Sequence, residues 1–174
     1  MLVKIVIGLI YVGLPLVGVA ALAPEESTEF DGQSVTDFAL QAPDGDMVGL
    51  RNFRGCPVIV EFFATWCPTS RAQLTELTKL HDKYADHGLA IFAFAVDPFE
   101  TPETTKDIGP LAFRMKLPFP VSGATRQLAD NYHYKGFPAT ILLNGEGKIA
   151  RTFFGYHEME KLETCVTPMF GIKK

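Results

Sequence analysis

The chain has 174 residues, of which 47% are hydrophobic, and this length allows one domain of ordinary size with a packed core. Its formal net charge is -4 at pH 7, and no basic cluster appears along it. We therefore exclude nucleic-acid-binding proteins, because these carry a basic patch or stripe.

The first 23 residues form an apolar segment in which Lys4 precedes an uncharged run over residues 5–23. The run is longer than the apolar region of a typical signal peptide and close to the roughly 20 residues that span a bilayer. Small residues from Gly18 to Ala23 nevertheless resemble a signal-peptidase site. We predict a membrane anchor or a signal peptide over residues 1–23, and the length favours the anchor. On either reading Lys4 stays inside, and the rest of the chain is exported to the periplasmic side, tethered or secreted.

Residues 24–34 are polar and acidic, contain a proline and a glycine, and show no apolar period. This composition predicts a linker. No internal repeat follows, so residues 35–174 are predicted to form one domain.

The first half of this domain begins with the pattern of a hairpin. Residues 35–40 alternate as in a short strand, and a Pro-Asp-Gly turn at 43–45 leads into a second extended stretch. The apolar run over 56–65 predicts a central strand covered on both faces. From Cys67 the spacing becomes helical. The apolar stripe of this helix consists of Leu74, Leu77, Leu80 and Tyr84.

The second half alternates strands and helices. A buried strand is expected over 89–96, followed by a mostly helical segment over 101–116 that is interrupted at Gly109-Pro110. An extended stretch, a short helix, a hairpin turning at 144–147 and an amphipathic helix are expected at 117–121, 125–134, 138–154 and 157–169. This order of elements predicts an α/β domain with a mixed sheet.

Cys67 stands at the predicted junction between a strand and a helix. The unpaired N–H groups and the dipole of a first helical turn favour thiolate over thiol, so this position predicts a reactive cysteine. Pro68 suits the first turn, and Trp66 would form an apolar wall beside the thiol that could contact a partner. The alternative is an inert buried thiol beside an ordinary core tryptophan.

Two stretches, "VIVEFFATWCPTSRAQL" and "GFPATILLNGEGKIARTFFG", resemble the thioredoxin superfamily and, within it, the exported TlpA-like thiol-disulfide oxidoreductases. The lead-in "FALQAPDGDMVGLRNFRG" resembles the N-terminal hairpin that those proteins share with peroxiredoxins. The resemblance covers the chain from Val35 to its end. It implies a thioredoxin-like fold, with a central mixed β-sheet flanked by helices and an N-terminal β-hairpin extension.

The resemblance also implies roles for individual residues. Cys67 falls on the attacking cysteine of the family and Ser70 on its resolving cysteine, while Pro138, preceded by Phe137, falls on the cis-proline that faces the site. A serine hydroxyl cannot release a mixed disulfide, although it can donate a hydrogen bond to the Cys67 thiolate. Release would therefore need an external thiol. The residues expected to contact a substrate are Trp66, Pro68, Thr69, Phe137 and Pro138.

Two further positions bear on proton transfer. Many TlpA-like proteins carry a glutamate where this chain has Gln73, so that acid is absent. Glu61 falls where thioredoxins keep a buried aspartate, and burial should raise its pKa. We therefore predict Glu61 as the proton acceptor for Cys67 or for an incoming thiol. The alternative is that strand twist lets Glu61 reach water or an arginine.

The other cysteines and the histidines indicate neither a second redox site nor a metal site. Cys56 is separated from Cys67 by a strand of about eight residues, roughly 25 Å, so it cannot resolve a disulfide there. Cys56 and Cys165 form either a structural bridge, which export would permit, or two buried inert thiols. The four histidines lack metal-ligand spacing, and we predict no metal and no cofactor.

Three functions remain open. The first is a single-cysteine oxidoreductase acting on exported protein thiols or disulfides, with a membrane electron donor or a low-molecular-weight thiol as its reductant. The second is a thiol peroxidase, since "CPTS" is similar to the "CPT" of peroxiredoxins, but Ala64 and Val60 replace the expected threonine and proline. The third is a non-catalytic module that binds a client through Trp66, Phe137 and Pro138.

Overall fold

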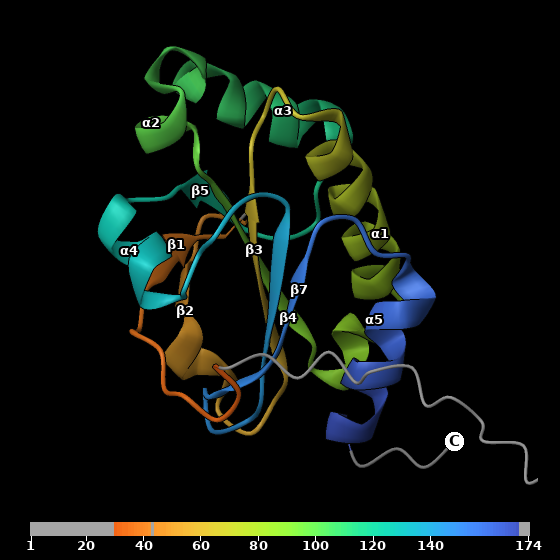
Figure 1. Ribbon diagram of the computed structural model, residues 1–174. Helices are drawn as coiled ribbons and strands as arrows, with labels where there is room; N and C mark the ends of the chain where they lie inside the picture. The colour runs from red at the N-terminus through yellow and green to blue at the C-terminus, as the bar shows by residue number, and fades with distance from the viewer. Residues whose placement is uncertain (1–29, 43, 171–174) are drawn as a thin grey trace, which may run out of the picture.

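The computed structural model describes residues 30–42 and 44–170, which form a mixed five-stranded sheet with helices on both faces (Figure 1). The α-helices and strands are β1 (Ala39–Gln41), β2 (Met47–Gly49), β3 (Val58–Phe63), α1 (Pro68–Tyr84), β4 (Ala90–Ala95), α2 (Asp97–Glu100), α3 (Ile108–Met115), β5 (Val121–Gly123), α4 (Arg126–Asn131), β6 (Ala139–Leu143), β7 (Ile149–Phe154) and α5 (Met159–Val166). Short 3-10 helices include η3 (Pro102–Asp107) and η4 (Thr167–Phe170). The predicted segment 1–23 lies outside the described residues.

The five-stranded sheet has the order β5-β4-β3-β6-β7. β3 runs parallel to β4 and antiparallel to β6, so the sheet is mixed, as predicted. Every residue of β3 is buried, because helices or the N-terminal hairpin cover both of its faces. The thioredoxin-like fold class is confirmed.

One face of the sheet packs against α1, α3 and α5 (Figure 1). The predicted stripe of α1 lies in this core, where Leu74, Leu77 and Leu80 are fully buried. Strand β3 contributes Ile59 and Phe63 to the same layer. Since side chains alternate along a strand, Glu61 points into this layer too.

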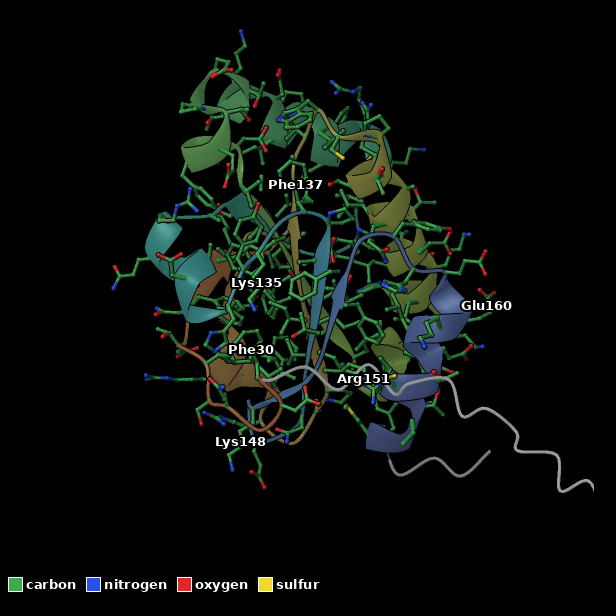
Figure 2. The ribbon with its side chains drawn as sticks, in the orientation of Figure 1. Phe30, Lys135, Phe137, Lys148, Arg151 and Glu160 are labelled. Carbon is green, nitrogen blue, oxygen red and sulfur yellow. The ribbon has the colours of Figure 1, made fainter. Side chains whose placement is uncertain are left out.

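The other face is covered by α4, by the antiparallel β1-β2 hairpin and by the segment before it. Phe38 packs edge-on against Phe92 and Phe94 of β4, with ring centroids 4.8 and 5.0 Å apart. Farther along, Phe30 stacks on His133, and Lys135 lies over the Phe30 ring with its Nζ 4.6 Å from the centroid (Figure 2). Because β1 and β2 pair as an antiparallel hairpin on this face, the predicted N-terminal hairpin is confirmed.

Two element predictions need correction. The segment 101–116 is not interrupted at Gly109-Pro110: η3 passes into α3 at Ile108, and both residues lie in the first turn of α3. Proline is tolerated there because the first N–H groups of a helix have no intrahelical acceptor. The last helix begins at Met159 rather than at residue 157, and η4 follows it.

Among the described residues, no helix combines the length and apolar character needed to cross a membrane.

Candidate functional site

The candidate site lies where β3 ends and α1 begins. Cys67 is the N-cap residue of α1, with an extended backbone. Strand β6 begins beside this point, because Ala139 pairs with Phe62, and the preceding Phe137-Pro138 peptide bond is cis. Figure 2 places Phe137 near the upper end of β3. Its ring meets the Trp66 indole edge-on, with centroids 5.2 Å apart. The fold thus brings Cys67, Trp66 and the Phe137-Pro138 pair to one end of the sheet.

The environment of Cys67 favours its thiolate. Partial burial raises the pKa of the Cys67 thiol, but hydrogen bonds from the N–H groups and hydroxyls of Ser70 and Thr69 more than offset this effect, and the pKa is lowered. Pro68, at the first position of the helix, has no N–H, so the donors come from the next two residues. The thiol is half-buried and therefore remains reachable. The alternative of an inert, buried Cys67 is not supported.

The Ser70 side chain connects α1 to the end of β3. It is buried, and its Oγ accepts a hydrogen bond from the Ala64 N–H at 3.3 Å. Because Ala64 uses a lone pair of that oxygen, the hydroxyl proton remains available for the Cys67 sulfur. Ser70 therefore links the end of β3 to the thiol.

Glu61 is a buried acid in the layer between the sheet and α1. It is fully buried, and burial raises its pKa to about 8, although a hydrogen bond from the Thr140 hydroxyl opposes the shift. The Thr140 Oγ1 donates to one carboxyl oxygen at 2.6 Å, while the other oxygen has no hydrogen-bond partner among the described residues. The alternative that Glu61 reaches water or an arginine is wrong, and the predicted rise in its pKa is confirmed.

Gln73 is buried one turn after Ser70. Its Oε1 accepts the His157 N–H at 2.7 Å, so it ties α1 to the segment before α5. Its Nε2 has no partner within the described ranges. Gln73 thus performs a structural task at a position where the resemblance implies an acid.

Cys56 and Cys165 are free, half-buried thiols, so the alternative of a structural bridge between them is wrong. Both residues are partly exposed, so the prediction that their thiols are buried is also wrong. In the part of the chain that the structure describes, no group of three His, Cys, Asp or Glu side chains could hold a metal ion.

The structure adds a side to the site that the sequence did not indicate. Trp66 Nε1 donates a hydrogen bond to Thr101 Oγ1 at 2.9 Å, although the two residues are 35 positions apart. Thr101 lies between α2 and η3, and the sequence of this segment does not indicate a contact with Trp66. The one sequence feature that points to this side of the site is Asp97, an acid directly after a buried strand.

A cysteine at the N-terminus of α1 and a cis-proline beside it, at one end of a mixed sheet, define a thioredoxin-like protein. Residues 32–152 match the AhpC/TSA family, and the chain belongs to that family.

Similar proteins agree with this assignment. The chain is 29% identical over 133 residues to the thioredoxin-like protein YneN of Bacillus subtilis, a match that covers 76% of each chain. It is 29% identical over 125 residues to the thiol-disulfide oxidoreductase ResA of Halalkalibacterium halodurans, covering 71% of this chain and 68% of the relative. A thiol:disulfide interchange protein of Chlorobium tepidum superposes with a TM-score of 0.67 at 22% identity, covering 79% of this chain and 96% of the other. This last likeness supports the fold.

Proposed function

We propose that this protein is a thiol-disulfide oxidoreductase that uses Cys67 as a single nucleophile on disulfides or mixed disulfides of exported proteins. The observation that carries the proposal is the half-buried Cys67 thiol at the start of α1, whose pKa is lowered by donors on Ser70 and Thr69. Similarity to proteins named thiol-disulfide oxidoreductase supports the same reaction class.

In the first step, the Cys67 thiolate attacks one sulfur of a client disulfide. A bond forms between Cys67 and that sulfur, the client disulfide breaks, and the other client sulfur leaves as a thiolate. Ser70 cannot attack the mixed disulfide, so the complex persists until an external thiol arrives. That thiol attacks the Cys67 sulfur and releases the client as a dithiol. A second external thiol then restores Cys67 and leaves as an external disulfide.

Glu61 is proposed to exchange a proton during this cycle. A carboxyl group with a pKa of about 8 is protonated in roughly nine molecules of ten at pH 7. Glu61 therefore begins as an acid that supplies the proton taken up by the leaving client thiolate. Its carboxylate then accepts the proton of the incoming external thiol. The prediction that Glu61 is an acceptor thus applies to the second half of the cycle.

The contacts proposed for a client are Trp66, Pro68, Thr69 and Phe137, whereas Pro138, the fifth predicted contact, is buried. Trp66, Pro68 and Thr69 are exposed around the half-buried thiol, and Phe137 packs against the indole. The same surface supports the second candidate, a module that holds a client without turnover.

The experiment that separates the two candidates is the pKa of Cys67. In the full chain carrying Cys56→Ala and Cys165→Ala, alkylation across pH with site assignment by mass spectrometry should give a value below the roughly 8.5 of a free thiol. A small disulfide should also leave a stable mixed disulfide on Cys67, and Cys67→Ser should abolish both signals. A pKa of about 8.5 or above, with no mixed disulfide, would favour the non-catalytic module.

The apolar composition of residues 1–23 supports a proposal about location. We propose that this segment anchors the domain 35–174 outside the cytoplasm through the linker 24–34, or directs its export and is then cleaved. Membrane fractionation and N-terminal sequencing of the expressed chain test the alternatives. Recovery of the intact chain in the soluble cytoplasmic fraction would contradict both.

A further inference from the structure

Asp97 is a fully buried acid that follows β4 and opens α2. Its carboxylate receives three donors. The Thr65 N–H donates to one oxygen at 3.1 Å, while the Thr65 hydroxyl and the Thr104 hydroxyl, the latter at 2.6 Å, donate to the other. Thr65 lies two residues before Cys67, so Asp97 holds the backbone that leads to the nucleophile.

A second connection runs from Asp97 to Trp66. The Thr104 Oγ1 lies 2.6 Å from the Asp97 carboxylate and 3.0 Å from the Thr101 Oγ1. The Thr101 carbonyl oxygen also lies within reach of this hydroxyl, at 2.8 Å. A hydroxyl has one proton, and a hydrogen bond to a carboxylate is stronger than one to either neutral oxygen of Thr101, so Thr104 donates to Asp97. Thr104 then accepts the hydroxyl proton of Thr101.

The direction of the whole chain follows from Trp66. An indole N–H can only donate, and it lies 2.9 Å from the Thr101 Oγ1. The hydrogen bonds therefore run from Trp66 to Thr101, from Thr101 to Thr104 and from Thr104 to Asp97. Each hydroxyl that donates becomes a better acceptor, so the buried carboxylate strengthens the bond at the exposed end.

We propose that Asp97 is a positioning residue for the site: through Thr104 and Thr101 it fixes the Trp66 indole beside Cys67, and through Thr65 it fixes the loop that carries the thiol. The proposal deepens the proposed function and rests on it. Trp66 is 47% exposed, so without this bond its side chain could rotate away from the Phe137 ring. An indole held before a client arrives loses less conformational entropy on binding than a free one.

Tryptophan fluorescence tests the positioning without any need for activity, because Trp66 is the only tryptophan in the chain. Thr101→Val replaces the hydroxyl with a methyl group of similar shape. We expect the ratio of held to free indole to fall about fivefold, so acrylamide should quench Trp66 more strongly. Thr164→Val is the matched control, because it removes an exposed hydroxyl on α5 that donates to the Lys161 carbonyl oxygen and also lies 3.8 Å from the Cys165 sulfur, in a helix that carries no part of the chain from Trp66 to Asp97. It should leave quenching unchanged.

Asp97→Asn tests the origin of the chain, since the amide cannot accept all three donors. Folded Asp97→Asn protein should show the same increase in quenching. If quenching stays at the wild-type value in Thr101→Val, the indole is not held by the chain. If it rises in Thr101→Val but not in Asp97→Asn, Asp97 has no part in it. The Thr101→Val result stands even where Asp97→Asn fails to fold.

Kinetics then connect the positioning to the reaction. In full chain carrying Cys56→Ala and Cys165→Ala, mixed-disulfide formation on Cys67 is followed with 4,4'-dithiodipyridine and with insulin. Thr101→Val should lower the rate with insulin about fivefold relative to the rate with the small disulfide, because a protein covers the indole whereas a small disulfide needs only the thiol, and Thr164→Val should change neither rate. Equal rates with insulin in both proteins would overturn the role of Trp66 in client binding. Failure of the parent protein to react with either probe would reject the proposed function, while fluorescence still decides the positioning.

Discussion

The Ser70 hydroxyl lies beneath the first turn of α1 and donates a hydrogen bond toward Cys67. Replacing it with a thiol in Ser70→Cys should create a dithiol site. We expect a disulfide between positions 67 and 70 after oxidation, because a neighbouring thiol has an effective concentration far above that of any external thiol. Release of a mixed disulfide at limiting external thiol should accelerate about tenfold or more. Peptide mapping of the oxidised protein and single-turnover kinetics measure the two effects.

Ala72→Cys is the matched control for this prediction. Ala72 lies on α1 two residues after Ser70 but is exposed, so its side chain does not occupy the buried position that Ser70 fills. The control should not speed up release. If Ser70→Cys leaves the release rate unchanged, the missing thiol is not what limits the cycle.

Thr140 sets the ionisation of Glu61 through one hydrogen bond. Its hydroxyl stabilises the charged carboxylate and so opposes the effect of burial. In Thr140→Val we therefore expect the pKa of Glu61 to rise further above its ordinary range. The measurement is a pH titration of the Glu61 carboxyl carbon by 13C NMR, assigned with Glu61→Gln. Thr152→Val is the control, because the buried Thr152 hydroxyl has no hydrogen-bond partner among the described residues. A fall in the pKa would contradict the assignment of this hydrogen bond.

At the scale of elements, the turn between β6 and β7 lies in close contact with the turn before β3, and this contact can be tested with one substitution. An added Cβ at Gly145, in the β6-β7 turn, would lie 2.9 Å from two backbone atoms of Gly55, the residue that precedes the approach to β3. Backbone cannot move aside as a flexible side chain can, so Gly145→Ala should destabilise the protein by about 1–3 kcal/mol. Urea denaturation measures the change.

Gly109→Ala provides the comparison. Gly109 is in the first turn of α3, and a Cβ there would meet no atom within 4 Å outside its chain neighbours and its own helix backbone. Alanine is a better helix former than glycine, but the following Pro110 disfavours a helical backbone at a residue that has a Cβ, so the change in stability should stay within about 1 kcal/mol. Equal destabilisation by the two substitutions would show that the contact with Gly55 is not the cause.

These elements also show how far the sequence could predict the fold. β3 and β4 are continuous apolar runs, and α1 carries Leu74, Leu77 and Leu80 at helical spacing, so local pattern alone identifies them. The prediction of a break at Gly109-Pro110 was wrong because the pattern does not show that a helix starts at Ile108.

The same limit applies to the site. Cys67 could be predicted because its flanking residues define a strand end and a helix start. Glu61 could be predicted because it interrupts an apolar run at the position where the resemblance to thioredoxins implies a buried acid. The hydrogen bonds from Trp66 through Thr101 and Thr104 to Asp97 could not, because they join segments about 35 residues apart that only the fold brings together. The hydrogen bond from the His157 N–H to Gln73 could not be predicted either, because the two residues are 84 positions apart.

For the whole molecule, the buried Glu61 links stability to pH. Its pKa is about 8 in the folded chain, against 4.5 for an ordinary glutamate. Below the lower value both the folded and the unfolded chain hold the proton. Between the two values the unfolded chain releases the proton and the folded chain keeps it, so the free energy of unfolding falls by up to about 1.4 kcal/mol per pH unit. Above about pH 8 Glu61 is ionised in both the folded and the unfolded chain. The free energy of unfolding has then fallen by a total on the order of a few kcal/mol and falls no further through this group.

Glu61→Gln removes this proton release and keeps an oxygen that can accept the Thr140 hydroxyl. We therefore expect the free energy of unfolding of the variant, relative to the parent protein, to rise between about pH 5 and about pH 9 by a few kcal/mol. Other titrating groups are common to both proteins and cancel in the difference. Urea denaturation at several pH values measures it, with the exposed Glu103→Gln as the matched surface control. A difference that stays constant across this range would mean that the Glu61 carboxyl group does not keep its proton in the folded protein, and the proton exchange proposed for the catalytic cycle would then have no source.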